Sequence, residues 1–240
     1  MDFALTQDQE MIRATAEAFL ADASPSTAVR QAMATVDGFD ATTWRRVGEE
    51  LGWCATTIPE DFGGLGLTIV EQVILMEQMG RRLFCSPYFA TACLAATALL
   101  QVGTPAARQR YLPAIASGTL TATLAFGECG LDGEAGTVTA TARPSAGGFC
   151  LSGRFRHVPD GASAQLLLLP GRVAGNDDIA LFAVPADSAG IQMHPHVTID
   201  ATRRLAEVRL NEVQIDEEAM VSMRGGVGDG LSRTSALAAI

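Results

Sequence analysis

The side chains best suited to acid–base or metal chemistry lie in two short stretches of the chain. Glu128, Asp132 and Glu134 are close enough in sequence to offer paired carboxylates for general acid–base catalysis. His194 and His196 flank a proline and are a candidate pair of metal ligands, although the chain has only three histidines. A solvated turn explains the first group and a polar turn at a strand edge explains the second, and these simpler interpretations are favoured. We therefore predict no catalytic residue and no metal site in either stretch.

Three further features have both a functional and a structural interpretation. The glycine-rich segment 63–66 is like a phosphate-binding loop but lacks a preceding strand, so a turn between helices with positive φ is favoured. Arg81 and Arg82 could attract an anionic ligand, but their position at the end of a predicted helix is also explained by the helix dipole. Cys129 has no neighbouring base, which favours an inert thiol.

The composition excludes several classes of function. Hydrophobic residues make up 48% of the 240 residues and charged residues 18%, which is typical of a globular protein. The net charge of −10 disfavours nucleic acid and anionic membranes as partners, because both would be repelled. All 17 basic residues are arginines, so a Schiff-base lysine, a pyridoxal-phosphate site and a P-loop are excluded.

Cysteine usage and the apolar stretches indicate the compartment. The five cysteines include no C-x-x-C pair, which indicates reduced, buried thiols rather than a disulfide framework. The N-terminus does not have the basic and apolar regions of a signal peptide. The longest nearly uncharged stretch, residues 87–101, is too short to span a bilayer. We expect a cytoplasmic protein with no membrane partner.

Helical patterns occupy the first half of the sequence. Capping residues stand before four expected helices: Thr6, Asp40, Thr68 and Thr104. The helix after Thr104 is expected to end near Pro113. Residues 87–101 are apolar nearly all round, which predicts a helix buried on every side. The polar segment 24–38 is predicted to be a loop.

From about residue 119 the pattern changes to that of strands. Short runs of β-branched and apolar residues are separated by glycine, proline and aspartate, at 121–126, 137–142, 149–151, 165–169, 179–184 and 206–210. The continuous apolar run Leu166–Leu169 predicts a central strand, and residues 231–240 return to a helical pattern. The expected fold is α+β and multidomain, with an N-terminal helical bundle (1–119), an antiparallel β-barrel or sandwich (120–220) and the start of a second helical domain (221–240).

The order of these elements and several motifs resemble the acyl-CoA dehydrogenase family. The opening residues 3–9 match the family's F-x-L-T-x-x-Q, and residues 51–67 are similar to its L-G-W…P-E-x-Y/F-G-G-L-G. Further resemblances follow in the family's order: E-E-L-G-R at 77–81, G-T…L-P…S-G at 103–118, V-P…G at 184–190 and T-x…V-x-F-x-x-V at 202–213. The resemblance covers nearly the whole chain.

The resemblance implies a flavin-dependent reaction on an acyl-CoA thioester. In that family the thioester lies between the flavin of FAD and a glutamate, which removes the α-proton while the β-hydrogen leaves as hydride to flavin N5. The glutamate belongs to the family's C-terminal helical domain, so no acidic residue of this chain is expected to serve as the base. A homo- or hetero-oligomer with another subunit of this type and an electron-transferring flavoprotein as acceptor are also implied.

The first flavin motif departs from the family. The family reads T-E-P-x-A-G-S-D where this chain has residues 127–134. Gly127 replaces the threonine that binds the flavin pyrimidine, and Gly133 replaces the serine near the pyrophosphate. The main chain at Phe126 remains available as a donor in this motif.

The second flavin motif departs further. The family reads G-x-K-x-W-I-T-N-G where this chain has residues 153–161, so His157 replaces the tryptophan that packs on the flavin. Pro159 replaces the threonine whose hydroxyl reaches N5, and proline has no N–H either. The main chain of Val158 could still donate. Because each hydrogen bond lost to a buried flavin edge costs about 1–3 kcal/mol, FAD binding is expected to be weakened or absent.

Two functions from different classes follow. The leading hypothesis is an acyl-CoA dehydrogenase-like flavoprotein that desaturates an acyl-CoA thioester. The alternative is a non-catalytic, flavin-poor subunit of a hetero-oligomeric acyl-CoA dehydrogenase. A flavin oxidase or monooxygenase on the same scaffold is a third interpretation. The residues expected at the cofactor are Phe126, Gly127, Gly133, His157, Val158 and Pro159.

Overall fold

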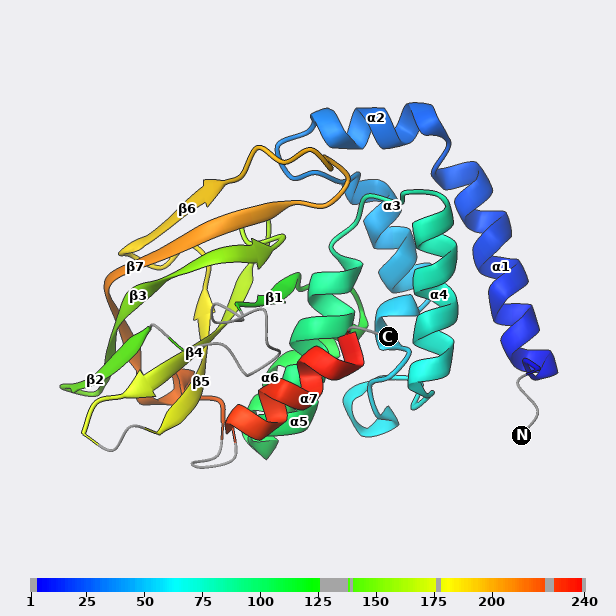
Figure 1. The fold of residues 1–240 in the computed structure, drawn as a ribbon. Helices are drawn as coiled ribbons and strands as arrows, with labels where there is room; N and C mark the ends of the chain where they lie inside the picture. Colours follow the sequence, from blue (N-terminus) through cyan, green and yellow to red (C-terminus); the bar gives the residue numbers. More distant parts are fainter. Residues whose placement is uncertain (1–3, 126–137, 139, 176–177, 223–226, 239–240) are drawn as a thin grey trace.

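Helices form the first half of the chain and a curled sheet forms the second (Figure 1). The structure is a computed structural model that describes residues 4–125, 138, 140–175, 178–222 and 227–238. After the sheet, a last helix lies back against the helical half (Figure 1). The expected α+β class and the order helices, strands, helix are confirmed.

The helices of the described residues are α1 (Gln7–Ala23), α2 (Ser26–Ala34), α3 (Ala41–Arg45), α4 (Ile69–Arg81), α5 (Ala96–Val102), α6 (Pro105–Ala116) and α7 (Val227–Ala238). π-helical turns follow α3 and precede α5 (Arg46–Glu50 and Phe89–Ala95), and 3₁₀ turns lie at Trp53–Ala55, Glu60–Phe62 and Glu217–Ala219. All four expected caps are confirmed, with capping boxes at Thr6 and Thr68.

The expectation of a loop over residues 24–38 is wrong for nine of them. Helix α2 begins directly after Pro25. It buries only Val29 and Ala32, which pack against Cys85. A helix of nine residues is marginal on its own, so its stability depends on tertiary packing, which the polar composition of the segment does not indicate.

Helix α6 runs past Pro113, where it was expected to end, and continues to Ala116. Proline removes one backbone donor from the helix. The carbonyl of Pro113 still accepts a hydrogen bond from the N–H of Ser117 (3.1 Å). Ile115 is fully buried, so packing stabilises a last turn that local propensity disfavours.

One mixed sheet makes up the β half, with strands β1 (Ala122–Leu124), β2 (Thr141–Ser145), β3 (Gly148–Pro159), β4 (Leu166–Val173), β5 (Ile179–Pro185), β6 (Ile191–Pro195) and β7 (Leu205–Asp216). The order is β1-β4-β2-β3-β7-β6, with β5 also paired to β4. β4, the strand expected to be central, is flanked by β1 and β5.

The sheet was expected to be antiparallel, but it is mixed. The pairs β2/β3, β3/β7, β4/β5 and β6/β7 are antiparallel, but β1 and β2 lie parallel to β4. Parallel neighbours require a long connection, and β3 is inserted in the chain between β2 and β4. Sequence spacing indicates hairpins between successive strands and contains no signal for such distant pairings.

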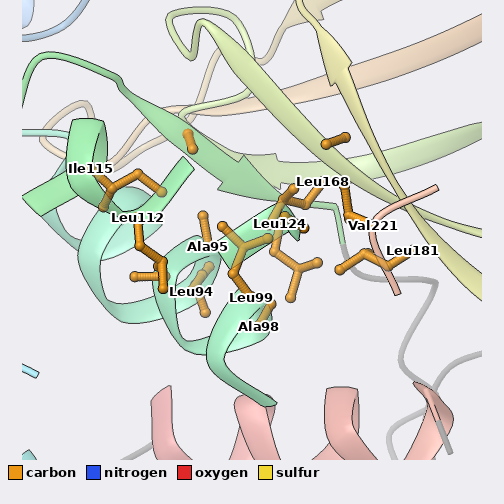
Figure 2. Close-up of a cluster of buried hydrophobic side chains, with 14 of the residues drawn as sticks. Leu94, Ala95, Ala98, Leu99, Leu112, Ile115, Leu124, Leu168, Leu181 and Val221 are labelled. Atoms are coloured by element: carbon orange, nitrogen blue, oxygen red, sulfur yellow. The ribbon is translucent and has the colours of Figure 1, made fainter. Parts of the chain in front are cut away.

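The helical half and the sheet share one hydrophobic core. Figure 2 shows Leu99 of α5 and Leu112 of α6 in the same cluster as Leu124 of β1 and Leu168 of β4. Residues 90–99 are all buried, which confirms the expected helix without a solvent-facing side. The positions of β1 and β4 are therefore fixed by the helices that pack on them.

Candidate functional site

Of the two flavin motifs, the structure describes the second, residues 153–161, which includes the end of β3. His157, Val158 and Pro159 are its last three residues, and Val158 and Pro159 pair with Ala206 and Leu205 of β7. The other expected cofactor residues, Phe126, Gly127 and Gly133, lie outside the described residues, as do Glu128, Cys129, Asp132 and Glu134.

His157 is exposed and its imidazole faces a second imidazole. The ring centroids of His157 and His196 are 5.4 Å apart, with an angle of 37° between the planes. His196 follows β6, and its Nε2 donates a hydrogen bond to the carbonyl of Arg156 (2.5 Å). The sheet thus brings together two rings that lie 39 residues apart in sequence, because β6 and β3 both pair with β7.

The pair His194 and His196 does not gain further ligands in the described part of the chain. No group of three or more histidine, cysteine, aspartate or glutamate side chains among the described residues is arranged to hold a metal ion. His194 instead lies opposite Glu207 in the register of β6 and β7.

The backbone of Val158 faces β7. The N–H of Asp160 donates to the carbonyl of Arg204 (2.9 Å), and in an antiparallel pair the residue two positions earlier faces the same partner strand. The amide of Val158 therefore points into the sheet. Its side chain is fully buried in the core of the β half.

Pro159 faces the opposite side of β3, toward β1. Its carbonyl accepts a hydrogen bond from Oγ1 of Thr123 (2.6 Å), a residue that is itself fully buried. On this side Pro159 offers neither an N–H nor a hydroxyl. The described motif residues therefore do not fit the donor set that a buried flavin edge requires.

Asp160, directly after β3, is a titratable residue that the sequence interpretation did not single out. It adopts a positive φ of 49°, and its carbonyl accepts from the N–H of Ser163 (3.0 Å) and of Ala164 (2.9 Å). Burial raises the pKa of its carboxyl to about 7, while Arg203 and Arg204 pull the pKa downward. The Asp-Gly dipeptide signals the turn but not the burial.

Arg204 joins the site to the helical half. Its Nη2 donates to the carbonyls of Met33 (2.5 Å) and Thr35 (3.0 Å), at the C-terminal end of α2. Gly38 makes room for this side chain, because a Cβ there would lie 2.7 Å from Cγ of Arg204. A guanidinium at the C-terminal end of a helix is electrostatically favourable, so Arg204 ties the start of β7 to α2.

An apolar groove of about 430 Å³ lies between α4, the turn before α5 and the end of α7. Val73, Met76, Phe89, Cys93 and Leu237 are among its lining residues. Burial raises the pKa of the Cys93 thiol to about 12, and the nearby charge of Arg203 opposes the shift.

The remaining candidates have structural roles. Gly63 and Gly66 adopt positive φ (77° and 62°) in a turn that leads from the 3₁₀ turn Glu60–Phe62 to α4, as predicted. The four described cysteines are free and buried, as expected of reduced thiols: Cys54, Cys85, Cys93 and Cys150. Within the described ranges, no helix combines the length and the apolar character needed to cross a bilayer.

Comparison with known proteins gives a matching family model and several similar proteins. Residues 6–119 match the family model described as acyl-CoA dehydrogenase, N-terminal domain. Acyl-CoA dehydrogenase IpdE2 of Mycobacterium tuberculosis is 29% identical over 87% of this chain and 53% of its own length. Acyl-CoA dehydrogenase FadE27 of the same organism is 32% identical over 74% of this chain and 45% of its own length.

A solved structure extends the match to the β half. The crystal structure of the ChsE4-ChsE5 complex from Mycobacterium tuberculosis has a TM-score of 0.85 and 25% identity, covering 99% of this chain and 63% of that chain. The chain spans about half the length of the two curated relatives. With its helical half, its mixed sheet and the motifs in their expected order, the chain belongs to the acyl-CoA dehydrogenase family.

Proposed function

We propose that this chain is a flavin-poor subunit of an acyl-CoA dehydrogenase assembly, in which another subunit holds FAD and desaturates the acyl-CoA thioester. The observation that carries the proposal is the lack of free hydrogen-bond donors for a flavin at the end of β3. Pro159 has no donor to offer, the amide of Val158 faces β7, and the exposed ring of His157 lies against His196. A subunit with these residues contributes binding surface rather than redox chemistry.

The chemistry of the reaction explains why a second subunit is needed. A saturated acyl chain has no electron sink of its own, so bound flavin supplies one in this family. This chain offers the apolar groove beside α4 for an acyl tail, and burial there excludes water. The groove is formed by α4, the turn before α5 and the end of α7, so its walls come from the helices of this chain.

An oligomer with a related but different subunit is part of the proposal. The ChsE4-ChsE5 structure, which matches 99% of this chain, is by its name a complex of two components. The chain spans about half the length of IpdE2 and FadE27, and the desaturation is proposed for the assembly rather than for this chain alone. An electron-transferring flavoprotein is the proposed acceptor of the assembly's electrons.

A second candidate is a chain that binds FAD itself and catalyses the desaturation. The hydroxyl of Thr123 favours it, because this donor lies 2.6 Å from the carbonyl of Pro159, on the side of β3 that faces away from β7. A rotation of that side chain would present one hydroxyl to a ligand beside Pro159. It would replace one of the lost donors and leave the missing amide uncompensated.

Flavin content distinguishes the two candidates. The chain is purified alone, its visible flavin absorbance is recorded, and FAD is titrated with fluorescence detection. We expect a colourless protein with weak FAD binding. Pro159→Thr restores a hydroxyl and an N–H and should tighten FAD binding at least tenfold, which corresponds to about 1.4 kcal/mol.

Pro195→Thr is the matched control, because Pro195 is also the last residue of a strand but lies in β6. It should leave FAD binding unchanged. A yellow wild-type protein with one tightly bound flavin per chain would instead establish the second candidate. If the subunit proposal holds, the colourless chain should form a stable complex with an FAD-loaded acyl-CoA dehydrogenase subunit, detected by size-exclusion chromatography.

A further inference from the structure

A polar cavity unrelated to the flavin motifs lies between α1 and the C-terminal end of α4. Its volume is about 220 Å³, and Glu17, Gln78, Arg81 and Arg82 line it. The two helices pack side by side, on the side of the helical half away from the sheet (Figure 1). The hydroxyl of Ser24, just after α1, donates to the carbonyl of Arg82 (3.2 Å), which ties the two helix ends together beside the cavity.

Gln78 is buried with an unused donor. Only 2% of the residue is exposed, and its Nε2 has no hydrogen-bond partner among the described residues. Its Oε1 accepts from Nη1 of Arg81 (3.4 Å), which fixes the orientation of the amide, because the reverse orientation would bring two donors together. A buried donor without an acceptor destabilises the fold, so a ligand that brings an acceptor to Nε2 of Gln78 would be stabilised in this cavity.

The two arginines indicate the charge of the missing acceptor. Neither Arg81 nor Arg82 forms an ion pair with a carboxylate in the described part of the chain. The helix dipole accounts for a cation at the end of α4 but not for a buried, unpaired amide next to it. Two arginine side chains and a buried amide with an unused N–H line one small cavity, and together they supply a donor set for an oxyanion.

We propose that this cavity binds an oxyanion of the phosphate class that carries a hydrogen atom. Arg81, Arg82 and Nε2 of Gln78 donate to its oxygens. Glu17, whose carboxylate belongs to the cavity lining, accepts the hydrogen bond from the protonated oxygen. Sulfate has no such proton at neutral pH, so the carboxylate of Glu17 repels it and the site prefers phosphate.

The test is calorimetric titration of the chain with inorganic phosphate at constant ionic strength, with sulfate and a phosphomonoester as the other arms. We expect one phosphate per chain. Gln78→Met and Arg81→Gln should each weaken binding at least tenfold, and Glu17→Gln should abolish the preference over sulfate. The phosphomonoester arm separates free phosphate from an esterified ligand of the same chemistry.

Arg45→Gln is the matched control, since Arg45 is an exposed arginine in the last turn of α3 and does not line the cavity. It should bind phosphate like the wild type. Circular dichroism checks that each variant is folded. If Gln78→Met does not fold, Arg82→Gln takes its place, because Arg82 is exposed. Absence of heat beyond a chloride reference would mean that water alone satisfies Gln78. An equal loss in Arg45→Gln would mean unspecific attraction to arginines. Either result overturns the proposal.

Discussion

Replacing Asp160 by asparagine should stabilise the protein, and the gain should grow with pH. Burial raises the pKa of this carboxyl from 3.8 to about 7, against the pull of Arg203 and Arg204. Between these two pKa values the native state holds a proton that the unfolded state releases. Stability from this group is therefore fully present at low pH and is lost as the pH rises toward the folded pKa. Asparagine accepts the positive φ of 49° and has no charge to bury.

The magnitude follows from the pKa shift of Asp160. One pKa unit corresponds to about 1.4 kcal/mol. With an unfolded pKa of 3.8 and a folded pKa of about 7, raising the pH from 5 to 8 lowers the free energy of unfolding by about 2–3 kcal/mol. A folded pKa one unit lower reduces this to about 1 kcal/mol. The stability gained by Asp160→Asn should accordingly rise by about 1–3 kcal/mol over this interval.

Urea unfolding of both proteins at pH 5 and pH 8 measures this change. The other ionisable groups are common to both proteins, so their effect cancels in the difference. Asp200→Asn is the control, because hydrogen bonds from the hydroxyl (2.6 Å) and N–H (2.9 Å) of Thr202 lower the pKa of Asp200. Asp200 is ionised throughout the interval, so that variant's deficit should be the same at both pH values. A gain from Asp160→Asn that is equal at pH 5 and pH 8 would refute the reasoning.

Three further substitutions test the helical half. Gly64→Ala should lower the free energy of unfolding by about 2–3 kcal/mol, because its Cβ would lie 1.8 Å from the carbonyl oxygen of Ile58. Gly80→Ala should raise the free energy of unfolding by about 0.5–1 kcal/mol, because its Cβ meets nothing within 4 Å. Equal urea midpoints for the two glycine variants would contradict both expectations. Asp40→Ala should cost about 1 kcal/mol at pH 7, because Oδ1 of Asp40 accepts hydrogen bonds from the N–H and the hydroxyl of Thr43 (2.7 Å each). These bonds lower the pKa of Asp40 from its ordinary value of 3.8. In urea titrations, the stability difference between wild type and Asp40→Ala should therefore disappear as the pH falls below 3.8 and passes the pKa of the folded state.

The features that sequence reasoning predicts well depend on neighbouring residues. The capping boxes at Thr6 and Thr68 need only a partner three residues ahead, and both are present. The apolar stretch 87–101 has no polar side to present to solvent, so burial all round is the only favourable outcome. Local rules of this kind place most of the helices and strands of the chain.

Features that depend on distant residues could not be predicted in the same way. The hydrogen bond from Arg204 to Met33 spans 171 residues, and a helix as short as α2 depends on such contacts for its stability. The parallel pairing of β1 and β2 with β4 and the burial of Asp160 also follow from packing between segments far apart in the chain. No spacing within the sequence contains this information.

The end of β3 explains how the fold can persist while the donors for a flavin are lost. Asp160 donates its N–H to β7, and the alternation of an antiparallel strand makes Pro159 face the other way. A proline at that position removes no hydrogen bond from the β3–β7 pair, and its carbonyl still receives the hydroxyl of Thr123. The substitution is therefore nearly neutral for the sheet and acts on whatever ligand lies beyond β3. Stability measurements on Pro159→Thr should accordingly change little, even where FAD binding changes at least tenfold.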